Sequence, residues 1–191
     1  MALTLLTLIL IALALALHHF QVPLQHRWRR RQARTMAAQL RGRDRDQPPQ
    51  LLYARLRAMD PLAFDELLLE SFERRGQKVI RNRRYTGDGG IEWHVVINGI
   101  VWFIQAKRYA DSIRPDHVVA FAALCRAKGR RGLFIHTGRT GPQSRAAIAH
   151  GGEIEIISGR MLLAVLTDGS FPDFPDRLPR SRSVTLAGKA V

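Results

Sequence analysis

The sequence predicts an α/β sandwich with a mixed central sheet, and two observations support this fold class. The first is a β-hairpin, because apolar, β-branched and aromatic runs flank Asn98-Gly99, a pair that favours a two-residue type I′ turn. The second is the alternation of short apolar strands with helical patterns after this hairpin. The 191 residues allow one domain of ordinary size with appendages, and a formal net charge of +14 indicates a polyanionic partner, either nucleic acid or an acidic membrane surface.

Residues 1–25 predict a transmembrane helix. The run from Ala2 to Leu17 is apolar apart from two threonines, and it can extend through Leu24, which brings it to the roughly 20 residues that a bilayer requires. The arginines follow this run, whereas a cleaved signal peptide has basic residues before its apolar segment. The positive-inside rule therefore predicts a single-pass protein of the inner (cytoplasmic) membrane, with lipid as a partner and the rest of the chain in the cytoplasm.

Residues 26–50 predict a basic juxtamembrane helix followed by a linker that contains Pro48-Pro49. The arginines of the helix are Arg27, Arg29, Arg30, Arg31 and Arg34. Contact with DNA is one interpretation of such a run. Arginines beside a membrane span more often set topology and face lipid, so we assign this segment to the membrane first.

The folded domain is predicted over residues 51–170. Its first helix begins with Asp60 as N-cap and Pro61 as the first helical residue, and it ends near Gly76. Cys125 lies in a helical apolar pattern and is expected to be a reduced core residue. Residues 171–191 predict a disordered tail rich in proline and small residues. The remaining predicted elements are a strand at 78–83, the hairpin at 87–108, helices at 115–127, 144–150 and 159–166, and strands at 132–137 and 154–157.

The hairpin gathers polar side chains on one face. If Ile97 pairs with Ile100, Glu92 lies directly opposite Gln105, and the two-residue period of a strand brings Lys107 to the same face. A carboxylate, an amide oxygen and an ammonium at this spacing suit a hard divalent cation with a water molecule beside it. The same spacing also fits an ordinary solvated cross-strand pair, and spacing alone does not decide between the two.

Several motifs occur in the order found in one nuclease family. They are FDELLLESFERRG, GDGGIE, QAKRY and GLFIHTG, which lie between residues 60 and 166. In these motifs the chain resembles the Mrr-type restriction endonucleases, a branch of the PD-(D/E)xK nuclease superfamily in which QxK replaces the usual (D/E)xK. The resemblance implies a restriction-endonuclease-like fold, Mg²⁺ or Mn²⁺ as cofactor, DNA as partner, and restriction-type cleavage of foreign or modified DNA.

The resemblance also implies roles for individual residues. It assigns catalysis to Glu92, Gln105, Lys107 and Asp65, and metal binding to Glu92 and Gln105 with support from Asp88. The chain departs from the family at two of these positions, because the family usually has FE in the first helix and GID in the hairpin. Here the matching residues are Asp65 and Glu92, so both carboxylates remain with their lengths exchanged.

Basic residues around the later elements predict contacts with DNA phosphates, which fix position rather than sequence. A solvated basic surface is the alternative interpretation. The predicted phosphate-binding residues are Arg108, Arg114, Arg131 and Arg139. The histidines show no metal-ligand spacing and are expected to be structural or exposed; they include His94, His117, His136 and His150.

Two other functions stay open at the level of sequence. The domain could be a structure-selective repair nuclease, because Holliday-junction resolvases belong to the same superfamily. Alternatively, the exchange of carboxylate lengths could mark a catalytically inactive fold that tethers DNA to the membrane. The sequence also leaves open whether the chain forms a homo-oligomer.

Overall fold

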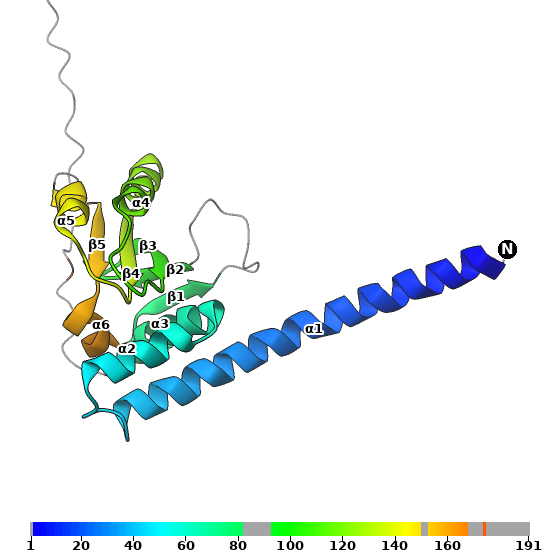
Figure 1. Ribbon diagram of the computed structural model, residues 1–191. Helices are drawn as coiled ribbons and strands as arrows, with labels where there is room; N and C mark the ends of the chain where they lie inside the picture. The colour runs from blue at the N-terminus through cyan, green and yellow to red at the C-terminus, as the bar shows by residue number, and fades with distance from the viewer. Residues whose placement is uncertain (1, 82–92, 150–152, 168–173, 175–191) are drawn as a thin grey trace, which may run out of the picture.

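A computed structural model describes residues 2–81, 93–149, 153–167 and 174 of the chain. From Pro61 onward its elements follow the predicted order, with boundaries that differ by a few residues, whereas the helix over Pro49–Ala58 was not predicted (Figure 1). The helices are α1 (Ala2–Arg41), α2 (Pro49–Ala58), α3 (Pro61–Arg74), α4 (Pro115–Ala127), α5 (Pro142–Ala149) and α6 (Gly159–Leu166). The strands are β1 (Lys78–Arg81), β2 (Trp93–Ile97), β3 (Ile100–Lys107), β4 (Arg131–His136) and β5 (Ile154–Ile157).

The five strands form one mixed sheet in the order β1-β2-β3-β4-β5. The first three strands are antiparallel, and β3, β4 and β5 are parallel. Parallel neighbours need a crossover connection, and α4 and α5 supply the two that are required here. The predicted α/β class with a mixed central sheet is therefore confirmed.

The β2–β3 hairpin has the register that its turn sequence predicts. Asn98 and Gly99 both have positive φ, at 51° and 77°, as a type I′ turn requires. Ile97 pairs with Ile100, and the pairing continues outward to Trp93, which lies opposite Ile104. Glu92 and Asp88 lie outside the described residues.

The two faces of β3 meet different layers, because successive side chains of a strand point to opposite sides. Trp102, Ile104 and Ala106 face the larger core, which α1, α2, α3 and α6 complete. Phe103 belongs to a smaller core with side chains of α4, including Phe121. Figure 1 shows the corresponding layers, with α4 and α5 on one side of the sheet and α3 and α6 on the other.

The C-terminal part of α1 belongs to the packed domain, although the sequence had predicted a basic juxtamembrane helix and a linker for this segment. Ala33, Met36, Ala37 and Leu40 are buried in the larger core. Their spacing of three and four residues places them on one helix face, and the two alanines allow α1 to lie close to α3. The domain therefore begins before Leu51, within α1.

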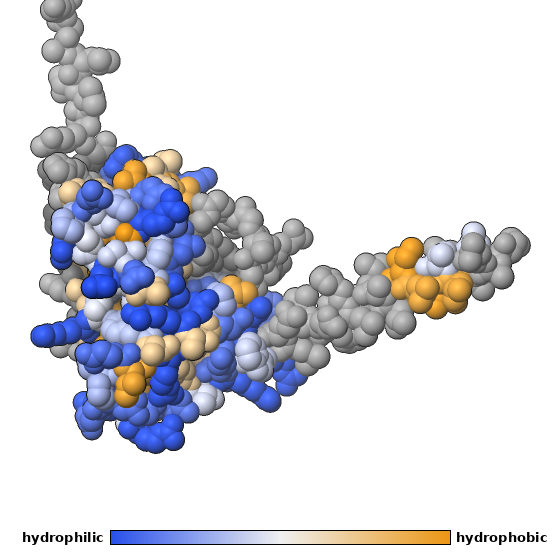
Figure 2. All heavy atoms as spheres, in the orientation of Figure 1, coloured by the Kyte–Doolittle hydropathy of each residue, from blue (hydrophilic) through white to orange (hydrophobic). Residues whose placement is uncertain are grey.

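The N-terminal part of α1 extends away from the domain (Figure 1). Several of its side chains are large, apolar and more than half exposed, and they gather near the end of the helix in Figure 2. These residues are Leu6, Ile9, Leu10 and Ile11. In the part of the chain that the structure describes, no helix combines the length and the apolarity that crossing a bilayer demands.

One residue of the predicted disordered tail is part of the core. Phe174 is 4% exposed, and its ring meets that of Trp102 edge-on with the centroids 5.3 Å apart. The Nδ2 of Asn98 donates a hydrogen bond to the Phe174 carbonyl at 3.4 Å. The prediction was wrong for Phe174 because its burial depends on Trp102, which lies 72 positions earlier (174 − 102). The rest of the segment 171–191 lies outside the described residues.

Candidate active site

Gln105 and Lys107 lie on one face at the carboxyl end of β3. Ala106, between them, points to the opposite face and is buried in the larger core. Gln105 and Lys107 are each partly exposed. Strand alternation therefore presents an amide and an ammonium side by side, as the sequence predicts.

The two side chains line a cavity of about 210 Å³ between β3 and α4, which we call the β3–α4 cavity. Its described lining consists of Gln105, Lys107, His117, Ala120, Phe121 and Leu124. The α4 members follow one another at intervals of three, one and three residues, so they form one helix face. The cavity thus has an apolar floor from α4 and polar groups from both elements.

The loops that follow β3 and β4 are bonded to each other at this end of the sheet. The backbone N–H of Thr137 donates to the Lys107 carbonyl at 3.2 Å, and the Thr137 hydroxyl donates to the Tyr109 carbonyl at 3.0 Å. Further along, the Arg139 N–H donates to the Asp111 carbonyl at 3.0 Å. These bonds fix the carboxyl ends of two parallel strands, the place where open α/β sheets commonly bind ligands.

Gly138 permits the close approach of these loops. A Cβ atom at this position would lie 2.2 Å from the Asp111 carbonyl oxygen and 2.7 Å from the Tyr109 Cβ. Both neighbours belong to the segment after Lys107, so a larger residue would push that segment away from β4. The glycine therefore helps to set the edge of the β3–α4 cavity.

Tyr109 holds the imidazole of His117. The Tyr109 hydroxyl is hydrogen-bonded to His117 Nδ1, and the two rings lie tilted with centroids 6.1 Å apart. Burial raises the pKa of the Tyr109 phenol, and the nearby Asp116 carboxylate raises it further, while Arg114 lowers it. The phenol is therefore protonated at neutral pH. Sequence reasoning missed this pair, because no spacing motif connects a tyrosine after β3 to a histidine in the first turn of α4.

His136 is a buried neutral residue next to this edge. It is 0% exposed and lies opposite Lys107 in the parallel register of β3 and β4. Burial lowers its pKa to about 4, so its ring is uncharged at neutral pH. Its Nε2 bonds to the Thr140 hydroxyl at 3.1 Å, which in turn bonds to the Ser158 hydroxyl at 3.2 Å. This chain ties the ends of β4 and β5 together.

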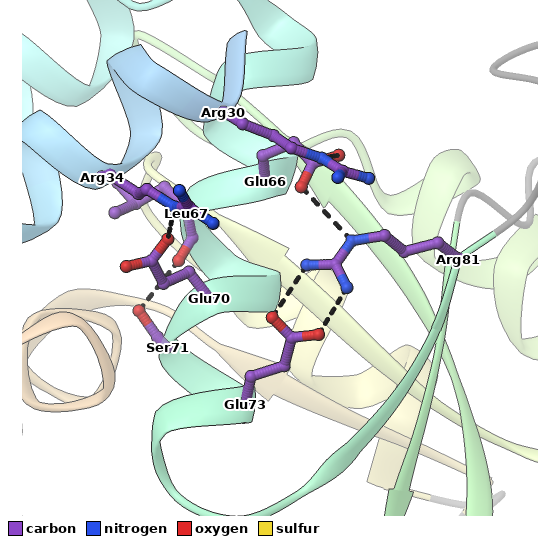
Figure 3. A network of polar contacts seen from close by, with 8 residues as sticks. All are labelled: Arg30, Arg34, Glu66, Leu67, Glu70, Ser71, Glu73 and Arg81. Atoms are coloured by element: carbon purple, nitrogen blue, oxygen red, sulfur yellow. Dashed lines mark hydrogen bonds and ion pairs between the residues drawn. The ribbon is translucent and has the colours of Figure 1, made fainter. Parts of the chain in front are cut away.

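A second polar cavity lies on the other side of the sheet and is lined by charged pairs (Figure 3). It measures about 110 Å³ and lies between α1, α3 and β1, so we call it the α1–α3 cavity. Glu66 is buried, with its carboxylate 3.4 Å from Arg81 Nε and 3.6 Å from Arg30 Nε. Arg81 also binds Glu73 through both of its terminal nitrogens, and Arg34 lies 3.5 Å from Glu70.

The α1 arginines therefore include structural residues, where the sequence had assigned the run first to lipid. Arg30 and Arg34 pair with α3 carboxylates, and Arg29 pairs with Asp60 at 3.2 Å. Asp60 is also the N-cap of α3, because its side chain accepts from the backbone N–H groups of Leu62 and Ala63. These contacts explain why α1 packs along α3.

Comparison with known proteins identifies the domain. The model of the Mrr catalytic domain, described as a restriction endonuclease, matches residues 56–166, which is more than half of the chain. The chain belongs to the Mrr-type restriction endonuclease family. No curated protein matches it. A solved structure of SfsA from Pyrococcus furiosus in complex with Ca²⁺ is similar at 16% identity and a TM-score of 0.34, and it covers 55% of this chain and 56% of the SfsA chain.

Among the described residues of the Mrr-type domain, two of those predicted to be catalytic share one cavity, and a third lies on another element. Gln105 and Lys107 share the β3–α4 cavity. Asp65 is 5% exposed and lies on α3, which covers the opposite face of the sheet, and it is not among the described residues that line this cavity. Glu92 and Asp88 lie outside the described residues.

Among the described side chains that line the β3–α4 cavity, Gln105 is the one that carries an oxygen atom. Gln105 offers a neutral amide oxygen, which is the hard type of donor that Mg²⁺ accepts. Among the residues that the structure describes, no group of three or more His, Cys, Asp or Glu side chains is arranged to hold a metal ion.

Two of the predicted phosphate-binding arginines are exposed near the cavity edge. Arg114 precedes α4 and forms a 2.7 Å ion pair with Asp116, and its side chain is 67% exposed. Arg139 follows β4, and its side chain is 83% exposed and lies 3.8 Å from the Asp111 carboxylate. Both guanidinium groups are accessible from solvent at the end of the sheet that carries Lys107.

The other two predicted arginines have structural contacts. Arg108 donates to the backbone carbonyls of Arg57 and Met59, at the C-terminal end of α2. Arg131 is 5% exposed, and its guanidinium lies 5.1 Å from the centroid of the Trp102 ring, with which it forms a cation–π contact. Arg131 also stands at the opposite end of β4 from the position that pairs with Lys107.

Proposed function

We propose that the chain is a metal-dependent DNA endonuclease that hydrolyses phosphodiester bonds in foreign or modified DNA. The observation that carries this proposal is the placement of Gln105 and Lys107 side by side at the β3–α4 cavity of an Mrr-type domain. The cavity is lined by side chains from the carboxyl end of β3, and the exposed Arg114 and Arg139 stand at the same end of the sheet. A phosphodiester can therefore approach an ammonium group there.

Glu92 is proposed as the carboxylate of this site. Trp93 pairs with Ile104, and an extension of this register by one residue would bring Glu92 opposite Gln105. We propose that Glu92, Gln105 Oε1 and Asp88 hold Mg²⁺ or Mn²⁺, with Asp65 in support from α3. When bound, such a cation acts as a Lewis acid on a phosphate oxygen and lowers the pKa of a coordinated water.

Lys107 has a separate role in this proposal. Its ammonium lies next to Gln105 on the same face of β3, where it can orient the attacking water. The same charge stabilises the additional negative charge that the oxygens around phosphorus carry in the pentavalent transition state. Because these interactions strengthen as the reaction proceeds, Lys107 contributes to rate more than to DNA affinity.

Binding is proposed to depend on phosphates rather than on bases. Arg114 and Arg139 are exposed at the cavity edge, and the chain carries a formal net charge of +14. Contacts of this type release condensed counterions, so affinity for duplex DNA should fall steeply with salt and vary little with sequence. Binding titrations at several salt concentrations measure this slope, and a flat dependence would contradict a role of the charge in DNA binding.

A cleavage assay on the full chain tests the proposal. Linear, branched and modified duplexes are incubated with Mg²⁺, with Mn²⁺ and with a chelator, and Lys107→Ala is compared with the exposed control Lys128→Ala. We expect cleavage that needs the cation, survives in Lys128→Ala and is lost in Lys107→Ala. Preference for branched DNA would instead support a structure-selective repair nuclease, and binding without cleavage of any substrate would support a DNA tether.

We also propose that α1 attaches the domain to the cytoplasmic face of the inner membrane. The support is the apolar sequence of residues 2–17 and the arginines after it. Because α1 runs without interruption from Ala2 into the packed domain, such an anchor would be joined to the nuclease by a helix. Recovery of the full-length chain in the soluble fraction of lysed cells would contradict this attachment.

A further inference from the structure

We propose that His117, held by Tyr109, is an additional substrate-binding residue that donates its Nε2–H to a non-bridging oxygen of the phosphodiester in the β3–α4 cavity. This inference rests on the proposed nuclease function and adds a residue that the family motifs do not include. In this arrangement the α4 side of the cavity contacts the phosphate.

The position of His117 supports this role. Its side chain lines the same cavity as Gln105 and Lys107, but it comes from α4, on the facing wall. It lies in the first turn of a 13-residue helix, where the helix dipole favours negative charge. An anionic group that enters the cavity therefore meets an ammonium from β3 and an imidazole from α4.

The bond to Tyr109 determines which ring nitrogen can donate. The Tyr109 phenol is protonated at neutral pH and can therefore donate its hydrogen to His117 Nδ1, and this inference assigns that direction to the bond. A neutral imidazole that accepts at Nδ1 carries its proton on Nε2. Among the described residues, no group is hydrogen-bonded to Nε2, so this donor is available to a ligand in the cavity.

The charges around His117 favour an anionic ligand beside its Nε2–H. Asp116, the adjacent acid, has its pKa lowered mainly by a hydrogen bond from Arg114, with which it forms a pair at the start of α4. Asp116 is thus ionised and engaged with Arg114 at neutral pH. The described lining of the cavity contains the Lys107 ammonium and no carboxylate.

Substitutions at His117 test the donor through steady-state kinetics. Alanine removes both nitrogens, glutamine offers an amide N–H near the position of Nε2, and asparagine offers its polar group near the position of Nδ1. We expect His117→Ala to lower kcat/KM about 10- to 100-fold, the range for one hydrogen bond to a charged group. Glutamine should recover part of this loss and asparagine should not, whereas a merely structural role predicts no such preference.

Tyr109→Phe tests the positioning of the ring. It leaves His117 in place but removes the group that fixes the tautomer, so kcat/KM should fall less than in His117→Ala. The double variant should be no slower than His117→Ala alone, because both substitutions affect one interaction. Additive losses would contradict the proposed coupling.

A spectroscopic measurement makes the inference independent of cleavage. The ¹⁵N NMR shifts of the imidazoles in the full chain, assigned by the signal that His117→Gln removes, report the tautomer directly. We expect the Nε2–H form in the wild type, a mixture in Tyr109→Phe, and a shift of the Nε2 signal when a short DNA duplex is added in a chelator. An Nδ1–H tautomer, or an Nε2 signal that does not respond to DNA, would overturn the inference.

The two readouts separate this inference from the proposed function. If the wild type does not cleave DNA but its Nε2 signal responds to the duplex, the nuclease proposal fails while the phosphate contact stands. If the wild type cleaves DNA and His117→Ala cleaves equally well, the inference alone fails. Melting temperatures of each variant, compared with the wild type, exclude unfolding as the cause of a loss.

Discussion

The two polar cavities of this protein contain similar residue types in different arrangements. In the α1–α3 cavity, arginine and glutamate side chains form ion pairs, and Glu66 is buried between Arg30 and Arg81. In the β3–α4 cavity, the described polar groups are an amide, an ammonium and an imidazole above an apolar floor. The ion pairs of the first arrangement join α1, α3 and β1 to one another, whereas we propose that the polar groups of the second bind a ligand.

The ion pairs of the α1–α3 cavity have a structural role, and we propose a functional role for the charge in the β3–α4 cavity. Each guanidinium of the α1–α3 cavity has a carboxylate partner from α3, so its charge is compensated within the fold. The β3–α4 cavity lies where two parallel strands end, and its residues come from elements that the bonded loops hold in place. Substitutions should therefore affect stability in the first cavity and activity in the second.

The largest effect is expected for Lys107→Ala. Cleavage should fall by about 10²- to 10³-fold or more, the usual loss when one group that stabilises transition-state charge is removed. DNA affinity should change little, because one ammonium among many basic groups contributes little binding. Parallel cleavage and binding assays measure the two effects, and metal-dependent nicking that persists unchanged in Lys107→Ala would refute the assigned site.

A pair of carboxylate exchanges tests whether Asp65 and Glu92 act in one site. If the shorter Asp65 accommodates the longer Glu92, Glu92→Asp alone should lower cleavage, although it restores the residue usual in the family. Adding Asp65→Glu should then recover part of the loss, as non-additive coupling between neighbours. Strictly additive losses in the kinetics of the single and double variants would show that the two positions act independently.

Glu66→Gln addresses the α1–α3 cavity. The substitution keeps the volume of a side chain that is 2% exposed but removes its charge, which leaves Arg30 and Arg81 without this partner. We expect the free energy of unfolding to fall by about 1–3 kcal/mol, since Arg30 is half exposed and water compensates part of the loss. Urea denaturation measures this value, and cleavage per folded molecule should stay the same.

The smallest effect concerns the pH dependence of stability at Glu73. A hydrogen bond from Arg81 lowers the pKa of this carboxyl below its ordinary value of 4.5. The contribution to stability is therefore complete above pH 4.5 and is lost as the pH falls through the lower folded-state pKa. Melting temperatures between pH 3 and 7, about the window of this titration, should decline less towards acid in Glu73→Gln than in the wild type. Parallel curves would contradict this assignment.

Local features of the sequence were sufficient to predict the hairpin and its polar face. Asn98-Gly99 determines the turn because its backbone needs positive φ, and the turn then fixes every pair out to Trp93 and Ile104. Strand alternation follows from the same register, so Gln105 and Lys107 had to share a face. The order of the family motifs added the identity of the domain, since these motifs occupy most of the folded region.

The contacts between residues that are distant in the sequence depend on the tertiary structure. The α1 arginines pair with α3 carboxylates and Phe174 packs on Trp102 because distant elements come together, and no local spacing encodes these distances. The contact of Tyr109 with His117 likewise depends on how the loop after β3 lies against the start of α4. Backbone conformation at a turn is a property of two residues, whereas a packed or paired side chain is a property of the whole fold.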